Sequence, residues 1–394
     1  SALRCNSKTV MVGVCVYGGF VLSLFAPRFG RHNNRRIQTV PGMIRRGMAF
    51  STSSSPGSAL YIRTPLIHSL PLSRRIGKDV YLKLDCLQPT GSFKDRGLSE
   101  YVRFVKEKQN AKRIISSSGG NAGHAAAWAG NSLGLNVTVV VPKSAPKFMV
   151  DKIKSHGAEV IVHGDVWKDA DNLVQEMVAK DPEAAYISPY DHPVIWEGHK
   201  SMIEEVYEDF KTMGEATPSA VVCCVGGGGM LCGIYDGLVE CGWGDYTSVV
   251  TAETAGAASF AKSVHSGEHV TLEKIETIAS TLAAPKVADG VIERMKSYKA
   301  GTYAVGDVSD PEAVQACVSF SRDHRFLVEP SCGAALSLLY NDRHKSLFDA
   351  SCRSSSEERG TQRGEGPIVM IVCGGGGVDM SILNGFQKKL GLTE

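Results

Sequence analysis

Several common features are missing from the 394-residue sequence, beginning with acidic residues near its start. The first fifty residues contain no Asp or Glu, but they hold seven Arg and one Lys. The rest of the chain has 35 basic and 41 acidic residues, so its net charge is −6 although the whole chain carries +2. Such a mildly acidic body lacks the basic face that nucleic acids require, and we expect no nucleic-acid partner.

Two nucleotide-binding motifs and the usual cysteine frameworks are also absent. Neither GxGxxG nor GxxxxGK[ST] occurs, which counts against an NAD-dependent oxidoreductase and against an ATP-binding loop. The eleven cysteines form no CxxC pair and no short-spaced ladder, which excludes the common zinc pattern and a secreted disulfide scaffold. We therefore expect buried, reduced thiols.

The N-terminal segment has the composition of a targeting sequence. No residue between Lys8 and Arg28 is charged, and an Arg-rich, acid-free stretch and a Ser-rich stretch follow up to Ser58. We interpret residues 1–58 as a targeting or disordered leader with a mitochondrial address. A secretory signal, a membrane anchor or no address at all, with a cytoplasmic protein, are the alternatives. Beyond residue 50 no run is apolar enough to span a bilayer, so we expect no membrane partner for the mature body.

From Leu60 onward, short β-branched runs alternate with amphipathic segments, and the charged segment Ser351–Gly366 is typical of a surface loop. This alternation predicts an α/β fold with mainly parallel sheets, and the length suits two doubly wound domains. The predicted strands are Val80–Leu84, Arg113–Ser117, Val137–Pro142, Glu159–His163, Ala220–Val225, Ser248–Ala252 and Ile368–Cys373. The predicted helices are Ala122–Ser132, Ala145–Ser155, Asp169–Ala179, Met230–Val239, Pro311–Asp323 and Gly333–Tyr340.

Two motifs supply polar groups at points where strands end, which is where open α/β sheets bind ligands. In Gln88–Gly97 (QPTGSFKDRG), a Gly-Ser-Phe turn precedes Lys94. An amine presented in this way can form a Schiff base with a carbonyl, although a lone Lys is usually a solvated surface residue. In Ser116–Gly123 (SSSGGNAG), glycines free N–H groups at the start of a helix, which predicts a site for an anion such as a carboxylate.

Two further motifs are rich in glycine. Val225–Gly233 (VGGGGMLCG) runs from a strand into a helix, and its four consecutive glycines allow N–H groups to wrap a phosphate. Val372–Gly377 (VCGGGG) follows the last predicted strand. Its Cys373 is either a packed thiol or a partner for the ring nitrogen of a cofactor.

Together these four motifs resemble the fold-type II pyridoxal phosphate (PLP) enzymes, which have a tryptophan synthase β-like fold. Pro189–His199 (PYDHPVIWEGH), Glu253–Phe260 (ETAGAASF) and Glu329–Leu336 (EPSCGAAL) are most similar to the L-serine/L-threonine dehydratases. The resemblance covers about Leu60 to Glu394. It implies a large PLP-binding domain of residues 59–87 and 193–394, a small domain of residues 88–192, and an active site in the cleft between them.

The resemblance also implies a role for each matching residue. Lys94 would be the Schiff-base lysine and the catalytic base that takes the substrate's α-proton. The activity implied is a lyase reaction, the dehydration and deamination of L-serine to pyruvate and ammonia, and of L-threonine to 2-oxobutanoate. The implied cofactor ligands are Phe93, Lys94, Asn121, Gly226, Gly227, Gly228, Gly229 and Cys373, and the substrate would be held by Ser118, Gly119, Asn121 and Ala122.

Members of this family also bind a monovalent cation, and the resemblance implies K⁺ held by Gly226, Glu253, Ala257, Leu282 and Ala284. Glu253 follows a predicted strand, so it could instead be a solvated loop acid. Two positions depart from the family pattern. Thr281 stands where a small apolar residue is expected, which could shift substrate preference, and Gly119 leaves more room near the substrate. A homodimer is the expected assembly.

Other functions remain open at this point. PLP-dependent β-replacement, as in cysteine or cystathionine synthases, and serine racemisation share the first steps of the elimination. A PLP-carrying protein without catalysis would not need the substrate loop at Ser118–Gly123, which is complete here. The motifs do not rank serine against threonine, and they do not show whether potassium is required.

Overall fold

The computed structural model describes residues 16–17, 20–21, 59–349 and 365–392. The chain divides into two units, Ser1–Ser51 and Thr52–Glu394. In the first unit, β1 (Val16–Tyr17) pairs with β2 (Phe20–Val21) in antiparallel fashion. Apart from these two short strands, the predicted leader lies outside the described residues, and so does the predicted surface loop up to residue 364.

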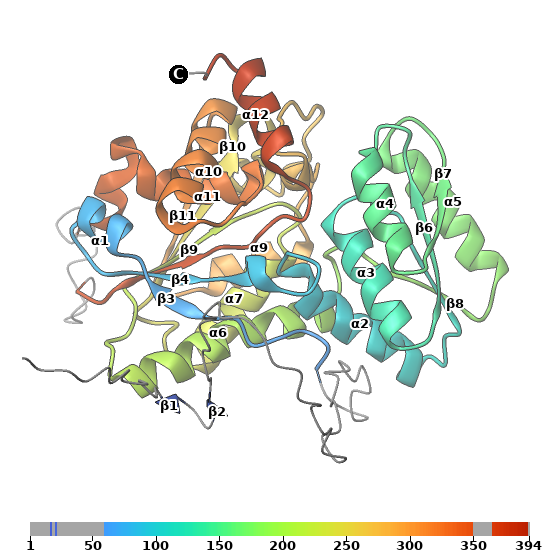
Figure 1. The fold of residues 1–394 in the computed structure, drawn as a ribbon, viewed down its shortest axis with the longest axis horizontal. Helices are drawn as coiled ribbons and strands as arrows, with labels where there is room; N and C mark the ends of the chain where they lie inside the picture. The colour runs from blue at the N-terminus through green and yellow to red at the C-terminus, as the bar shows by residue number, and fades with distance from the viewer. Residues whose placement is uncertain (1–15, 18–19, 22–58, 350–364, 393–394) are drawn as a thin grey trace, which may run out of the picture. The chain divides into compact units, whose positions relative to one another are not determined.

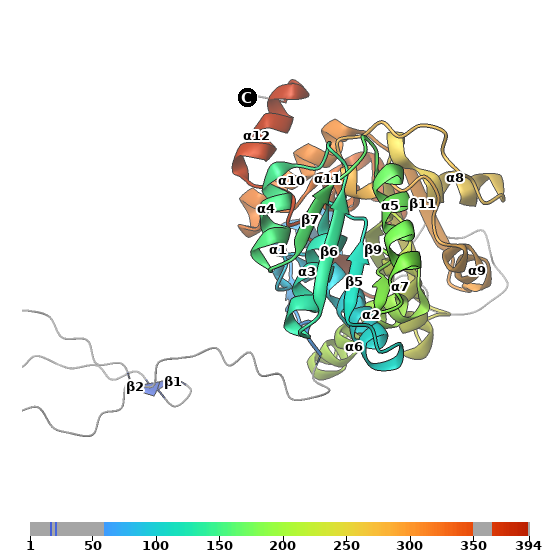
Figure 2. The same ribbon diagram turned by 90° about the vertical axis from the view of Figure 1, so that its right-hand side faces the viewer.

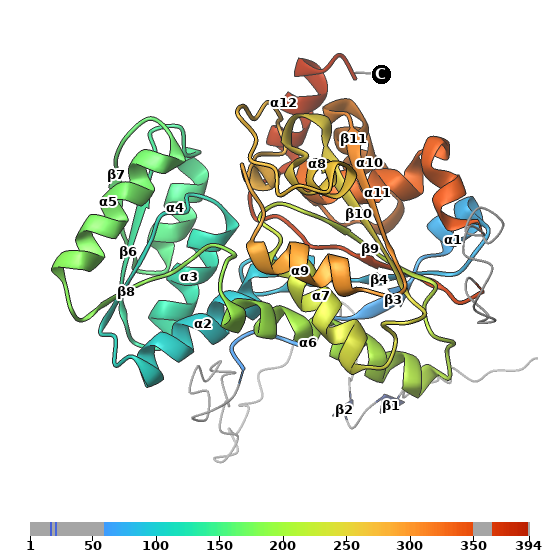
Figure 3. The same ribbon diagram turned by 180° about the vertical axis from the view of Figure 1, so that it is seen from behind.

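The second unit contains a six-stranded sheet in the order β11-β10-β9-β12-β4-β3. Its strands pair in parallel, except that β3 runs antiparallel to β4 at one edge. Figures 1 and 3 show α10 and α11 on one face of this sheet and α6 and α7 on the other. The central strands are wholly buried because both faces are covered, which explains their continuous apolar sequences. The strands are β3 (Leu66–His68), β4 (Val80–Lys83), β9 (Ala220–Cys224), β10 (Ser248–Thr254), β11 (Thr302–Val308) and β12 (Ile368–Ile371).

A second sheet of four parallel strands has the order β7-β6-β5-β8. Helices α3 and α4 cover one face and α5 covers the other (Figure 2). Its strands are β5 (Arg113–Ser116), β6 (Asn136–Val141), β7 (Glu159–Val162) and β8 (Ala184–Tyr186). The α/β fold with mainly parallel sheets is therefore confirmed.

The described part of the second unit contains twelve α-helices and four 3₁₀-helices. The α-helices are α1 (Leu70–Ile76), α2 (Lys94–Lys108), α3 (Asn121–Ser132), α4 (Lys147–Ser155), α5 (Trp167–Lys180), α6 (Pro193–Met213), α7 (Gly229–Glu240), α8 (Ser259–Ser266), α9 (Asp289–Ser297), α10 (Asp310–His324), α11 (Pro330–Tyr340) and α12 (Met380–Lys389). The 3₁₀-helices are η1 (Asp85–Leu87), η2 (Ala255–Ala257), η3 (Ser280–Leu282) and η4 (Asp342–Phe348).

All seven predicted strands and all six predicted helices occur, with ends shifted by up to three residues. The sequence patterns did not identify β3, β8 and β11, or helices such as α2 and α6. Strands β3 and β8 have only three residues each, and β11 is an edge strand that is only partly buried. Such strands lack the long apolar run by which buried strands are recognised.

Helices α2 and α6 cross at two glycines. A Cβ atom on Gly198 would lie 2.7 Å from both the Arg96 carbonyl oxygen and the Gly97 Cα atom. A Cβ on Gly97 would lie 2.6 Å from the Ile195 carbonyl oxygen and from the His199 ring. Because the obstructing atoms include backbone, a larger residue would force the helices apart. This contact holds the first turn of α2 against α6.

Among residues 59–349 and 365–392, no helix combines the length and the apolar composition that crossing a membrane would require.

The close contact of α2 and α6 at Gly97 and Gly198 predicts that one added methyl group destabilises the protein. Replacing Gly198 with Ala should lower the free energy of unfolding by about 1–3 kcal/mol, the usual cost of overpacking a tight contact. Urea denaturation would measure the change. The matched control is Gly385→Ala in α12, where nothing lies within 4 Å of the added Cβ. The control should be neutral or stabilising, and equal stability of the two variants would contradict the prediction.

Candidate active site

Two of the motifs meet at the start of α2. Phe93 N–H donates to the Cys373 carbonyl oxygen over 3.0 Å, and Gly375 N–H donates to the Gly91 carbonyl oxygen over 2.9 Å. Lys94 is the first residue of α2. The Gly-Ser-Phe turn and the final glycine loop are thus one hydrogen-bonded unit that carries Lys94.

The Lys94 amine lies in a desolvated environment. Its Nζ atom donates to the Pro189 carbonyl oxygen over 2.6 Å. Burial lowers the pKa of Lys94 to about 8, against the opposing effects of Cys224, Cys373 and Glu329, which raise it. A lysine with this pKa has a larger neutral fraction near neutral pH than an exposed one, and only the neutral amine can act as a nucleophile or base.

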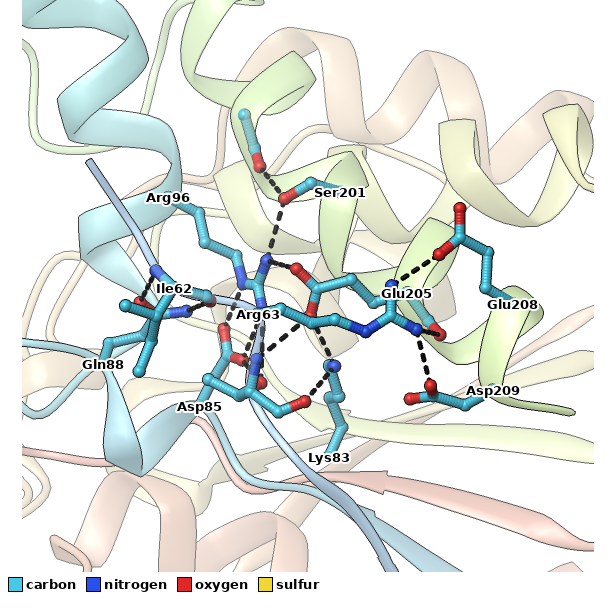
Figure 4. Close-up of polar contacts among 12 residues, drawn as sticks. Ile62, Arg63, Lys83, Asp85, Gln88, Arg96, Ser201, Glu205, Glu208 and Asp209 are labelled. Carbon is cyan, nitrogen blue, oxygen red and sulfur yellow. Dashed lines mark hydrogen bonds and ion pairs between the residues drawn. The ribbon is translucent and has the colours of Figure 1, made fainter. Parts of the chain in front are cut away.

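Two residues beyond Lys94, the fully buried Arg96 anchors the first turn of α2 (Figure 4). Its Nε and Nη2 atoms donate to both Asp85 carboxylate oxygens over 2.7 and 3.0 Å. Its Nη1 and Nη2 atoms donate to both Glu205 carboxylate oxygens over 2.7 and 2.8 Å. Burial alone would lower the pKa of Arg96, but the two carboxylates outweigh it and raise the pKa.

A second buried cation, Lys83 in β4, completes this charge cluster. Its Nζ atom lies 2.5 Å from a Glu205 oxygen and donates to the Thr64 carbonyl oxygen over 2.7 Å. Arg96 and Lys83 therefore balance Asp85 and Glu205, and the four side chains have no net charge. The cluster joins the end of β4, the start of α2 and the middle of α6, which is how Lys94 comes to lie beside Pro189.

A hydrogen-bonded group centred on Glu329 joins the substrate loop to the last glycine loop. Asn121, the first residue of α3, donates from Nδ2 to Glu329 Oε1 over 2.9 Å and accepts from Gly376 N–H at Oδ1 over 3.1 Å. Thr281 Oγ1 donates to the same Glu329 oxygen over 2.6 Å. Burial raises the pKa of Glu329 to about 7, while Thr281, Asn121, Lys94 and Lys152 oppose the shift.

The glycine run Gly226–Gly229 has the shape and the donors of a phosphate cradle. Gly228 has φ +87°, and a Cβ on Gly227 would lie 2.2 Å from the Tyr190 ring. Within the described part of the chain, the N–H groups of Gly227, Gly228 and Gly229 have no hydrogen-bond acceptor. This helix start requires glycine, because a side chain would be strained at Gly228 and would clash with Tyr190 at Gly227. Its free N–H groups are suited to binding a phosphate.

Cys373 is buried beside a second thiol. Its Sγ atom lies 3.5 Å from Cys224 Sγ, and both thiols are near enough to Lys94 to affect the pKa of its amine. The hydrogen-bonded neighbouring thiols and burial raise the pKa of Cys373 well above its ordinary value, so the thiol is neutral. The eight described cysteines are all free. A neutral thiol fits a ring nitrogen that stays unprotonated.

The predicted substrate loop lies at the start of α3. Ser118 Oγ accepts from Gly120 N–H over 3.3 Å, and a Cβ on Gly123 would lie 1.8 Å from the Ser118 carbonyl oxygen. Gly119 lies within this turn, and Ala122 is the second residue of α3. The loop faces η3, because Thr281 Cγ2 lies 3.9 Å from the position of a Cβ on Gly120. The structure thus places all four motifs around Lys94, Glu329 and Thr281.

The structure brings two of the predicted cation ligands together. A Cβ on Gly226 would lie 3.4 Å from Leu282 Cα, so these two residues are neighbours. The Leu282 carbonyl already accepts from Ala284 N–H over 2.7 Å. Ala257 ends η2. Among the described residues, no group of three or more His, Cys, Asp or Glu side chains could hold a metal ion.

Glu253 is not a solvated loop acid. The structure extends β10 to Thr254, so Glu253 belongs to the strand and is fully buried. Its two carboxylate oxygens accept from Phe260 and Ala261 N–H over 3.0 and 2.6 Å at the start of α8. Burial raises the pKa of Glu253 to about 8, and these hydrogen bonds oppose the shift.

Sequence reasoning missed three residues of this site. Glu329 was seen only as part of a motif, although an acid at the head of an apolar helix is a signal that it is buried and bonded. Tyr190 packs against the phosphate cradle, and its carbonyl oxygen accepts from Trp196 Nε1 over 2.9 Å. Arg96 gave no signal that distinguishes it from a surface arginine, because its partners come from distant segments.

Comparisons with known proteins agree with this arrangement. A family model described as "Pyridoxal-phosphate dependent enzyme" matches residues 58–353. The L-serine dehydratase of Dictyostelium discoideum is 37% identical over 350 residues, which cover 86% of this chain and 95% of that protein. The L-serine dehydratase/L-threonine deaminase of Mus musculus is 38% identical over 335 residues, which cover 85% of this chain and 97% of that protein. The crystal structure of an L-serine ammonia-lyase from the fungus Rhizomucor miehei has a TM-score of 0.75 at 30% identity, covering 84% of this chain and 99% of that one.

The charge cluster predicts a large effect from one buried carboxylate. Glu205→Gln should lower the free energy of unfolding by about 3–5 kcal/mol, because it breaks a buried pair and leaves Arg96 and Lys83 with too little negative charge. Urea denaturation would measure it. Glu208→Gln is the control, since Glu208 pairs with Arg63 at the surface with both side chains about half exposed. The control should cost no more than about 1 kcal/mol, and a similar loss in both variants would refute the prediction.

Proposed function

Because this chain belongs to the family of pyridoxal-phosphate dependent enzymes, we propose that it is an ammonia-lyase that acts on L-serine and L-threonine. L-Serine would give pyruvate and ammonia, and L-threonine would give 2-oxobutanoate and ammonia. One observation carries the proposal. The desolvated Lys94 amine donates to Pro189, next to Tyr190, whose ring packs against Gly227 of the glycine run, in a chain whose curated relatives have this activity in their names.

The residues around Lys94 suit each part of the cofactor. The N–H groups of Gly226–Gly229 would hold the phosphate, Phe93 would lie on one face of the ring, and Cys373 would face the ring nitrogen. Asn121 would bind the ring oxygen with the Nδ2 hydrogen that Glu329 does not use. Lys94 would attach the cofactor covalently. The bound cofactor supplies an electron sink that stabilises negative charge on the α-carbon of the substrate.

The chain's own groups then carry out the elimination. The free N–H groups and the Ser118 hydroxyl at the start of α3 would hold the substrate carboxylate. The neutral Lys94 amine would take the α-proton, and the resulting ammonium would return that proton to the β-hydroxyl, which would leave as water. Addition of water to the resulting enamine product then releases ammonia and the keto acid. Lys94 acts as a base near neutral pH because burial has lowered its pKa to about 8.

Two other reactions share the early steps. A β-replacement enzyme would add a second nucleophile after the hydroxyl leaves, and a serine racemase would return a proton to the α-carbon. Steady release of a keto acid from L-serine without another nucleophile is the reaction expected of the lyase, so finding it would favour the lyase over the other two. The curated relatives at 37–38% identity favour the lyase.

The central test measures ammonia and keto-acid release from L-serine and from L-threonine by the full chain loaded with pyridoxal phosphate. We expect release from L-serine without an added nucleophile. Lys94→Ala should lower kcat by at least about a hundredfold, since it removes the general base, and it should abolish the absorption band of the lysine-bound cofactor. Lys106→Ala, on the exposed end of α2, is the matched control. An enzyme that released no keto acid, or an active Lys94→Ala variant with an intact absorption band, would refute the proposal.

We further propose that a monovalent cation, K⁺, binds near Glu253. Support comes from the burial of this carboxylate without an ion-pair partner among the described residues. A buried anion is costly unless a cation is near. Carbonyl groups of Gly226, Ala257, Leu282 and Ala284 would complete the site, and a neighbouring cation would lower the pKa of Glu253.

Potassium dependence is a direct test of this site. The wild-type rate should rise when K⁺ replaces tetramethylammonium at constant ionic strength, and Glu253→Gln should abolish that rise while its amide oxygen still accepts one of the two N–H groups at the start of α8. The control is Glu276→Gln, an exposed acid that pairs with Lys274. Equal wild-type rates in both salts, or activation that persists in Glu253→Gln, would contradict the proposed site.

Three sequence-based expectations stay predictions. These are the boundaries of the large and small domains at residues 88 and 192, the mitochondrial address of residues 1–58, and the homodimer.

A further inference from the structure

Thr281 in η3 lies between two of the loops that surround Lys94. Its carbonyl oxygen would lie 2.9 Å from a Cβ on Gly226, at the phosphate cradle. Its methyl carbon Cγ2 would lie 3.9 Å from a Cβ on Gly120, at the substrate loop. The backbone of Thr281 therefore contacts one loop and its side chain faces the other. Thr281 is itself exposed, so a ligand can reach it.

The hydroxyl of Thr281 is held by two partners. Oγ1 donates to Glu329 Oε1 over 2.6 Å and is hydrogen-bonded to Ser331 Oγ. Glu329 in turn cannot move easily, because it is buried, accepts from Asn121 Nδ2, and packs against Gly375, where a Cβ would lie 2.3 Å from Glu329 Cγ. The hydroxyl direction is thus set by a buried group.

A fixed hydroxyl fixes the methyl as well. Oγ1 and Cγ2 are both bonded to Cβ, and β-branched side chains have few allowed χ1 rotamers. With Oγ1 turned toward Glu329, Cγ2 must point toward Gly120. Rotation of the methyl away from the substrate loop would break both hydrogen bonds of the hydroxyl and leave Glu329 with one donor fewer.

A substrate held by its carboxylate at the substrate loop brings its β-carbon close to this methyl, since only the α-carbon separates the two groups. L-Serine carries hydrogens where L-threonine carries a β-methyl. A second methyl next to Cγ2 overpacks the space, which packed sites tolerate poorly. We propose that Thr281 is a specificity-determining residue that makes the enzyme prefer L-serine to L-threonine. This inference rests on the proposed function.

The test separates the methyl from the hydroxyl with two variants. Thr281→Ser removes the methyl and keeps both hydrogen bonds, whereas Thr281→Val keeps the methyl and removes them. In Thr281→Ser, the ratio of kcat/KM for L-threonine to kcat/KM for L-serine should rise about tenfold or more, the usual effect of one methyl group in a binding site. In Thr281→Val this ratio should not rise, although both activities should fall because Glu329 loses a donor.

Binding is measured alongside the rates. Saturating L-threonine should raise the melting temperature of Thr281→Ser more than that of the wild type, whereas L-serine should raise both equally. Thr277→Ser serves as a control from the same segment, and its substrate ratio should match that of the wild type.

Each outcome is decisive. An unchanged ratio in Thr281→Ser, or a ratio that rises equally in Thr281→Val, would overturn the role of the methyl. A wild type that already prefers L-threonine would overturn it too. If the wild type releases a keto acid from neither amino acid, the proposed function itself fails. Turnover of L-serine with no effect of Thr281→Ser would remove this inference alone.

Discussion

The burial of Arg96 is the constraint on which the site depends. A guanidinium group stays protonated in proteins, so it can be buried only where carboxylates neutralise it. Here Asp85 and Glu205 each bind it through two oxygens. Because Asp85 begins η1, just after β4, and Glu205 lies in α6, satisfying Arg96 draws η1, α6 and α2 together. Lys94, two residues away on the same helical turn, is placed beside Pro189 as a result.

The ligand-binding loops likewise use few charged side chains. The mildly acidic body presents N–H groups at the starts of α3 and α7, where helix dipoles favour anions. Glycines at 227 and 228 allow this arrangement, since Tyr190 fills the space that a side chain at Gly227 would need. A chain of this composition can therefore hold a carboxylate and a phosphate without a cluster of arginines.

Glu329 connects three of the loops around Lys94. One carboxylate oxygen accepts from Asn121 and from Thr281, which belong to different loops, and its side chain packs against Gly375 in a third. A change in any of these loops must alter the hydrogen bonds of the others. The position of Thr281 therefore affects the substrate loop through Glu329 as well as through its own methyl group.

Much of this protein was determined by its sequence alone. The central strands could be predicted because a strand buried on both faces must be continuously apolar, and the four motifs because glycine runs and a lysine after a turn are local features. The edge strands β3, β8 and β11 could not, since they are short or only partly buried. The sequence pattern ended a strand at Ala252 and left open whether Glu253 was a solvated loop acid, whereas β10 continues to Thr254, which pairs with Val308 of β11, and Glu253 is buried. Only the tertiary structure decided the partners of Arg96, Glu329 and Thr281. Their acceptors and donors lie as many as 208 residues away along the chain, and no local pattern records which distant side chains will meet once the sheets have packed.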